Sequence, residues 1–211
     1  MRWGWERLAA LAGVVAVVLW VVGAVMQDSS NLPQETPEET LAWFRAETGT
    51  LLASSYLWML GSVFFLIFLG ALRLRLLAVE GPTAFFTAIA FAGGTATAIL
   101  TMLMPGGILA GAISENDLTA DAALTLTFIE LAFFGAAKLS AALMLAAAAV
   151  VILRYRALPR WIGWSALLLA LLMLIPPIGW AGLLLGLPLW TLVVAITLWM
   201  RPAIEPGAPR A

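Results

Sequence analysis

Lys138 and Glu130 are the two charged residues that the sequence places well inside an apolar run. Lys138 is the only lysine of the chain and lies in the middle of the run over residues 122–153, and Glu130 precedes it by eight residues. A run of this length predicts a membrane-spanning helix, in which a central lysine costs ~2.5–3.5 kcal/mol unless water or a partner satisfies it. We therefore expect Lys138 to face the protein interior for a structural or functional reason.

Helix geometry limits a direct contact between these two side chains. Eight residues advance an α-helix by ~12 Å and leave Glu130 and Lys138 about 80° apart around the axis. Long side chains lean toward the helix N-terminus, so Lys138 leans toward Glu130 while Glu130 leans away. We therefore expect a water molecule or a hydroxyl group to link them. The hydroxyl groups at matching depth on neighbouring predicted helices include those of Ser62 and Thr97.

The last apolar run adds a predicted helix break at a similar depth. Gly182, Gly186 and Pro188 interrupt this run, and an interior proline frees the carbonyl group four residues back, at Leu184. Transporters build substrate and ion sites from broken helices near mid-membrane. Two interpretations stay open: either Glu130 and Lys138 form a buried polar tie between helices, or together with the break they form an ion, proton or small-solute site.

The residue types narrow the chemistry further. The chain contains neither cysteine nor histidine, which excludes disulfides, thiol chemistry, His-ligated haem and zinc sites built from those ligands. A Ser140–Lys138 dyad is excluded because residues two apart on a helix face different ways. The net charge of −1, with basic residues at predicted helix ends, gives no sign of nucleic-acid binding. We expect no metal, no cofactor and no enzymatic activity.

Composition assigns the chain to membrane proteins. Its residues are 63% apolar and 11% charged, against about 45–50% and 25% in soluble domains. We predict a single all-α domain over residues 1–211, a six-helix transmembrane bundle. The predicted spans are residues 8–26, 51–72, 83–104, 122–153, 161–175 and 178–200. The fifth span is short for a hydrocarbon core of ~30 Å, so a re-entrant hairpin over 161–200 is the alternative.

Arginine placement predicts the orientation, because basic residues are retained in cytoplasmic loops. With both termini in the cytoplasm, only Arg45 lies outside. The arginines then inside are Arg2, Arg7, Arg73, Arg75, Arg154, Arg156, Arg160, Arg201 and Arg210. The preference for arginine over lysine is typical of GC-rich bacterial genomes, so we expect the bacterial cytoplasmic (inner) membrane. Most tryptophans fall near predicted membrane boundaries, whereas Trp190 falls in the middle of a span.

The outer loops carry a predicted surface helix. Thr36 and Glu39 form a capping box ahead of a predicted amphipathic helix over residues 37–48, which we expect to lie flat on the outer surface. It is either a lid on the ends of the spans or a contact for lipid or a partner through Leu41, Trp43 and Phe44. A second outer loop is predicted over residues 105–121. Elsewhere, small residues such as Gly93 and Gly94 predict close helix approach in a monomer or a homo-oligomer.

Four segments, taken in order, carry a resemblance to a known group of proteins. They are Thr36-Pro37-Glu38-Glu39, Trp43-Phe44, Phe68-Leu69-Gly70-Ala71-Leu72-Arg73 and Ala157-Leu158-Pro159-Arg160-Trp161-Ile162-Gly163-Trp164. With them the chain resembles small uncharacterised bacterial integral-membrane proteins that are grouped as a domain of unknown function. The resemblance implies a six-helix fold and no particular activity.

These observations lead to two expectations about function. The first is a structural, accessory or lipid- or partner-contacting membrane protein, with lipid, a second copy or another membrane protein as its partner. The alternative is a small ion, proton or solute transporter or channel that uses Glu130 and Lys138. A transport site requires a polar cavity that reaches Lys138, whereas a structural tie requires Lys138 to be enclosed and fully paired.

Overall fold

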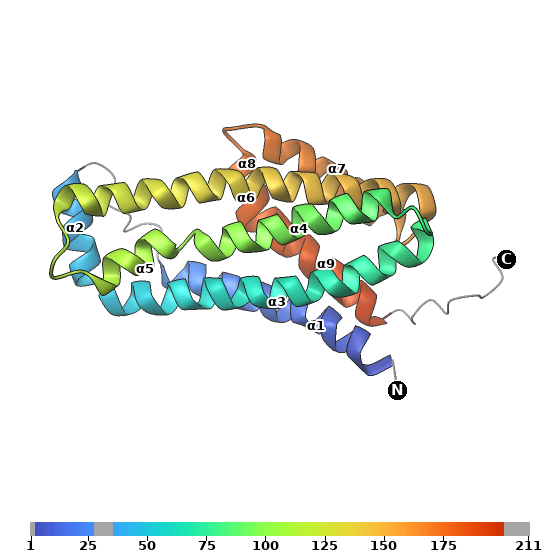
Figure 1. Ribbon diagram of the computed structural model, residues 1–211, viewed down its shortest axis with the longest axis horizontal. Helices are drawn as coiled ribbons and strands as arrows, with labels where there is room; N and C mark the ends of the chain where they lie inside the picture. Colours follow the sequence, from blue (N-terminus) through green and yellow to red (C-terminus); the bar gives the residue numbers. More distant parts are fainter. Residues whose placement is uncertain (1–2, 28–35, 201–211) are drawn as a thin grey trace.

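The computed structural model describes residues 3–27 and 36–200, and every regular element in these ranges is helical (Figure 1). The predicted all-α fold class is therefore confirmed for the described part of the chain. The elements are α1 (Trp3–Met26), α2 (Pro37–Ala46), α3 (Thr48–Glu80), α4 (Phe85–Leu103), α5 (Gly106–Ile113), α6 (Ala120–Tyr155), α7 (Arg160–Leu174), α8 (Gly179–Ala181), the π-helical turn η2 (Gly182–Gly186) and α9 (Leu187–Met200).

Within residues 3–27 and 36–200, five helical stretches are long and apolar enough to cross a membrane, which supports a multi-pass membrane protein. They are Arg7–Met26, Thr48–Glu80, Phe85–Ile113, Ala120–Tyr155 and Gly179–Met200. Helix α7 has 15 residues and rises only ~22 Å, less than the ~30 Å of a hydrocarbon core. The count of six spans therefore stays a prediction. The orientation also stays a prediction, because Arg2, Arg201 and Arg210, near the two ends of the chain, lie outside the described residues.

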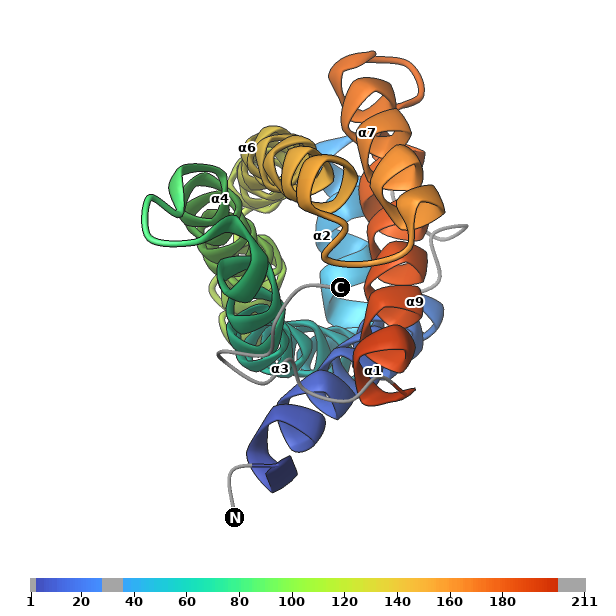
Figure 2. The same cartoon turned by 90° about the vertical axis from the view of Figure 1, so that its right-hand side faces the viewer.

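The long helices form a ring that follows the order of the chain. Helix α1 packs on α3, α3 on α4, α4 on α6 and α6 on α7, and α9 closes the ring against α1. Helix α2 lies across one end of this ring (Figure 2). We call that end the α2 end. The opposite end, where α3 and α6 end and α7 begins (Figure 1), we call the arginine end, because these segments carry Arg73, Arg154 and Arg160.

Small residues set the distance between neighbouring helices, as predicted for Gly93 and Gly94. A Cβ atom on Gly93 would lie 2.9 Å from the backbone nitrogen of Met144 and 3.1 Å from the carbonyl oxygen of Ser140. Helices α4 and α6 therefore touch backbone to backbone, a packing that membrane proteins build with small residues.

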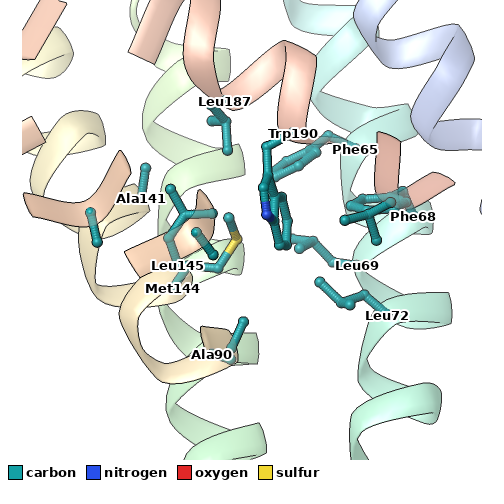
Figure 3. Close-up of a cluster of buried hydrophobic side chains, with 14 of the residues drawn as sticks. Phe65, Phe68, Leu69, Leu72, Ala90, Ala141, Met144, Leu145, Leu187 and Trp190 are labelled. Carbon is teal, nitrogen blue, oxygen red and sulfur yellow. The ribbon is translucent and has the colours of Figure 1, made fainter. Parts of the chain in front are cut away.

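The centre of the ring is filled by apolar side chains (Figure 3). Phe65, Phe68 and Leu145 are fully buried. The Trp190 ring lies among them and is 3% exposed. Its indole N–H donates a hydrogen bond of 3.3 Å to the carbonyl oxygen of Ile162, which explains a tryptophan in the middle of an apolar run. Apolar side chains of α3, α6 and α9 thus pack together inside the ring.

Helix α2 forms largely where the capping box predicts it. The Thr36 hydroxyl accepts a hydrogen bond of 3.3 Å from the Glu39 N–H, and the helix ends at Ala46, two residues earlier than predicted. At the far end of α2, the Thr48 hydroxyl bonds the Glu115 carboxylate, and Arg45 donates to the Glu115 carbonyl oxygen at 3.3 Å. These bonds tie the junction of α2 and α3 to the segment after α5.

The prediction of a loop over residues 105–121 is wrong for its first half, residues 106–113. Residues Gly106–Ile113 form helix α5, and Ile108 and Ala112 are buried against the rings of Trp43 and Phe44. A Cβ atom on Gly111 would overlap the Phe44 ring. The apolar stretch becomes helical because α2 covers it, and a cover from so distant a segment is not visible in the local sequence.

Candidate functional site

Lys138 lies beside the turn that joins α7 to α8. Its side chain is partly buried, and a Cβ atom on Gly179 would lie 3.0 Å from its Cδ and 3.1 Å from its Nζ. Within residues 3–27 and 36–200, no group forms a hydrogen bond or an ion pair with the Lys138 ammonium. The ammonium is therefore held in place by packing at this turn.

A backbone carbonyl group without a helical donor faces the same point. Helix α7 is followed by two prolines, and Pro177 lacks the N–H that would bond the carbonyl oxygen of Met173. A Cβ atom on Gly179 would lie 2.7 Å from that oxygen and 3.1 Å from the Lys138 Nζ. Lys138 thus lies at the C-terminal, electronegative end of α7, where a cation is favoured.

The turn between α7 and α8 lies beside the middle of α6, because Lys138 is near the midpoint of Ala120–Tyr155 (Figure 1). Helix α7 therefore runs along the half of α6 that is nearer the arginine end, and α9 completes a hairpin with α7 while packing on α1. Because Gly179–Met200 is itself long and apolar enough to cross a membrane, two spans and a re-entrant hairpin over residues 161–200 both stay predictions. In the other half of α6, the side chains of Phe128 and Leu131 are exposed.

Glu130 belongs to a different environment from Lys138. Its carboxyl group is partly buried, and the polar group that interacts with it is the side chain of Gln27, directly after α1. Lys138 instead points to the turn after α7. The structure therefore does not bring the two predicted site residues together, because each faces a different neighbouring helix.

The hydroxyl groups of Ser62 and Thr97 also lie away from Lys138. The Ser62 hydroxyl is 3.0 Å from the Thr101 hydroxyl, and the Thr97 hydroxyl donates to the carbonyl oxygen of Gly93 at 2.8 Å. All three hydroxyl groups are buried on α3 and α4. The Ser62–Thr101 pair joins α3 to α4, the Thr97 bond lies within α4, and neither links Lys138 to Glu130.

The predicted break before Pro188 is present, but Lys138 lies at another break. Residues Gly182–Gly186 form a π-helical turn in which the Leu187 N–H bonds the Gly182 carbonyl oxygen, and Pro188 is buried just after it. The Leu184 side chain is exposed. The break at Lys138 is the one at Pro176 and Pro177. The sequence signal that could have identified it is this pair of prolines directly after an apolar run too short to span.

The predicted outer contact residues pack inward. Trp43 and Phe44 are buried against α5 and α6, and Leu41 packs partly buried against the same cluster. This packing is that of a lid on the ends of the long helices. A contact of the two rings with lipid or a partner would require α2 to lift away from the bundle.

Two further observations limit the chemistry of the site. Within the described ranges, no group of three or more His, Cys, Asp or Glu side chains gathers as a metal site would require. Glu130 and Lys138 are separate, since Glu130 interacts with Gln27 and Lys138 lies against Gly179. No family model, curated protein or solved structure matches this chain. The function must therefore be argued from the geometry of the helices.

Proposed function

We propose that this protein is a non-enzymatic, accessory membrane protein that docks on another membrane helix through the half of α6 nearer the α2 end. The observation that carries the proposal is the exposed face of α6 beyond the α7–α8 turn. There α6 presents the exposed side chains of Phe128 and Leu131 next to partly buried Glu130, and Lys138 marks the point where the hairpin cover ends.

The energetics of charged groups in lipid support this proposal. Ionisable side chains within a membrane are expensive unless they face protein or water. Packing and interhelical hydrogen bonds drive helix association in membranes, so a docked helix would lower that cost. The partner is a second copy of the chain or another protein. Membership of the family of small bacterial inner-membrane proteins, and cytoplasmic termini, belong to the same proposal.

Photo-crosslinking from single cysteines tests the docking surface, because the chain has no native cysteine. Leu131→Cys and Leu168→Cys are a matched pair, since these side chains are 63% and 58% exposed on α6 and α7. With a thiol-attached benzophenone in native membranes, we expect a discrete protein adduct from Leu131→Cys and none from Leu168→Cys. Adding Lys138→Met should weaken that adduct. Equal protein adducts at both positions, or lipid adducts alone, would contradict the proposal.

A second candidate function is transport of an ion, a proton or a small solute. One observation favours it: the Lys138 ammonium lies close to the Met173 carbonyl oxygen at a helix break, as in transporter sites. Against it stands the apolar packing around Trp190, which offers no polar side chain to a solute. In proteoliposomes with an internal pH dye, we expect proton flux no higher than in empty liposomes. Flux that Lys138→Met abolishes and Leu139→Met leaves intact would establish transport instead.

A further inference from the structure

One face of α6 stays open along the half that extends past the α7–α8 turn (Figure 1). Phe128, Leu131 and Leu139 are 60%, 63% and 56% exposed, and helix geometry places them within about 80° of one another around the axis. Gly135 lies between them, and a Cβ atom there would meet nothing within 4 Å. A glycine among exposed apolar side chains lets the backbone of another membrane helix approach closely.

Lys138 borders this open face. It follows Gly135 by three residues, a step of about 60° around the helix axis. The Lys138 ammonium lies against Gly179 and forms no hydrogen bond or ion pair with any group in the part of the chain that the structure describes. The nearby carbonyl group of Met173 is neutral, so the positive charge has no counter-charge among the described residues.

The depth of Lys138 limits where a counter-charge can come from. Lys138 lies near the midpoint of α6 (Ala120–Tyr155), ~25 Å from either end. The phosphate groups of lipids lie outside a hydrocarbon core ~30 Å thick, and so at least ~15 Å from its middle. Ionisable residues within membrane helices usually pair with one another. The counter-charge that fits this depth is therefore an acidic side chain on another membrane helix.

A second copy of this chain does not provide that acid. Arginine placement predicts one orientation for every copy, so symmetric copies hold equal residues at equal depth. Glu130 is the acid that the sequence places well inside an apolar run, but it lies ~12 Å from Lys138 along the helix axis. It also interacts with Gln27, away from the open face. Contact between two copies through this face would instead bring two Lys138 ammonium groups together, and like charges at an interface repel each other.

We propose that the helix that docks on α6 belongs to a different membrane protein and carries an aspartate or a glutamate at the depth of Lys138. The inference rests on the docking role proposed above and names the chemistry of the partner. The partner carboxylate pairs with the Lys138 ammonium, and the partner's apolar side chains pack on Phe128 and Leu131 around Gly135. An ion pair formed in this way satisfies two charges that are costly to leave alone in lipid.

Synthetic transmembrane helices test this partner chemistry. The full chain with Leu131→Cys and a thiol-attached benzophenone is reconstituted in phosphatidylcholine liposomes with a leucine–alanine peptide of about 23 residues, long enough to span the bilayer. One peptide carries a glutamate at its centre, which stays at mid-membrane in either orientation, and the matched peptide carries a glutamine there. We expect roughly five- to tenfold more adduct from the glutamate peptide.

Substitutions at Lys138 assign this preference to the charge. Lys138→Met should remove the difference between the two peptides, whereas Lys138→Arg retains the positive charge and should keep it. Leu139→Met is the matched control on the neighbouring residue and should also keep it. If Lys138→Met fails to fold, a peptide with its glutamate two turns from the centre tests the depth instead. We expect its adduct with the Leu131→Cys protein to fall to the level of the glutamine peptide.

The outcomes separate this inference from the docking role itself. Equal adducts from the glutamate and glutamine peptides, or a difference that Lys138→Met leaves intact, would overturn the acid-bearing partner. Docking on α6 would still stand if Leu131→Cys formed a protein adduct in native membranes. A native adduct with twice the mass of the chain would identify a second copy and overturn the inference. Absence of any native protein adduct would contradict docking and the inference together.

Discussion

Gly179→Ala should lower the free energy of unfolding by about 1–3 kcal/mol and move the Lys138 side chain. The new Cβ would lie 2.7 Å from the carbonyl oxygen of Met173, which belongs to the backbone and can shift only with the end of α7. It would also lie 3.0 Å from the Lys138 Cδ. Unfolding of the detergent-solubilised protein by SDS, followed by helix content, measures the loss.

Gly135→Ala is the matched control for this effect. Gly135 lies on α6 three residues before Lys138, and a Cβ there would meet nothing within 4 Å. We expect its stability to stay unchanged or to rise by up to about 1 kcal/mol, since alanine favours a helix over glycine. The double variant Gly179→Ala with Lys138→Met should show a coupling energy between the two sites. Equal stability of the two alanine variants would contradict the described packing at the turn.

Gly107→Ala should be at least as damaging, with an expected loss of about 1–3 kcal/mol or more. Its Cβ would overlap the carbonyl oxygen of Leu126, so α5 and α6 would have to separate. Glu130 lies one turn beyond Leu126, and we expect its contact with Gln27 to loosen as well. The same SDS titration measures the stability, and faster alkylation of Leu131→Cys in this background would report the loosening of α6.

The neighbouring glycine provides the control for Gly107. A Cβ on Gly106 meets nothing within 4 Å, and both residues lie at the start of α5. Gly106→Ala should therefore leave the free energy of unfolding unchanged within about 0.5 kcal/mol. If the two substitutions had the same effect, the close approach of α5 to α6 at Leu126 would be wrong.

Helix α2 and helix α5 show why some elements were predictable and others were not. The capping box of α2 is a local signal, since Thr36 and Glu39 contact each other within one helical turn. Helix α5 has no such signal, and its apolar side chains are covered by Trp43 and Phe44 from a distant segment. A short apolar stretch becomes a helix only when that cover is present.

The candidate site shows the same division. The apolar run around Lys138 and the interruption at Gly182, Gly186 and Pro188 could be predicted, because hydropathy and proline geometry are properties of the residues themselves. The residue that packs against Lys138 could not be predicted. The sequence predicts a water molecule or a hydroxyl group between Lys138 and Glu130, whereas Lys138 lies against Gly179 and Glu130 interacts with Gln27.

By itself, the sequence predicted a membrane protein, a helical fold and the approximate limits of the long helices. These follow from single residues, because each unpaired backbone group and each charge is costly to place in lipid. It also identified the two intramembrane charges. Only the tertiary structure decided that the α7–α8 turn stops beside the middle of α6, that Lys138 lies against Gly179, and that Trp190 fills the core. These features depend on which helix backbones approach closely. Helices associate in membranes through the shapes of their side chains, and the hydropathy pattern of the sequence does not show which shapes fit together.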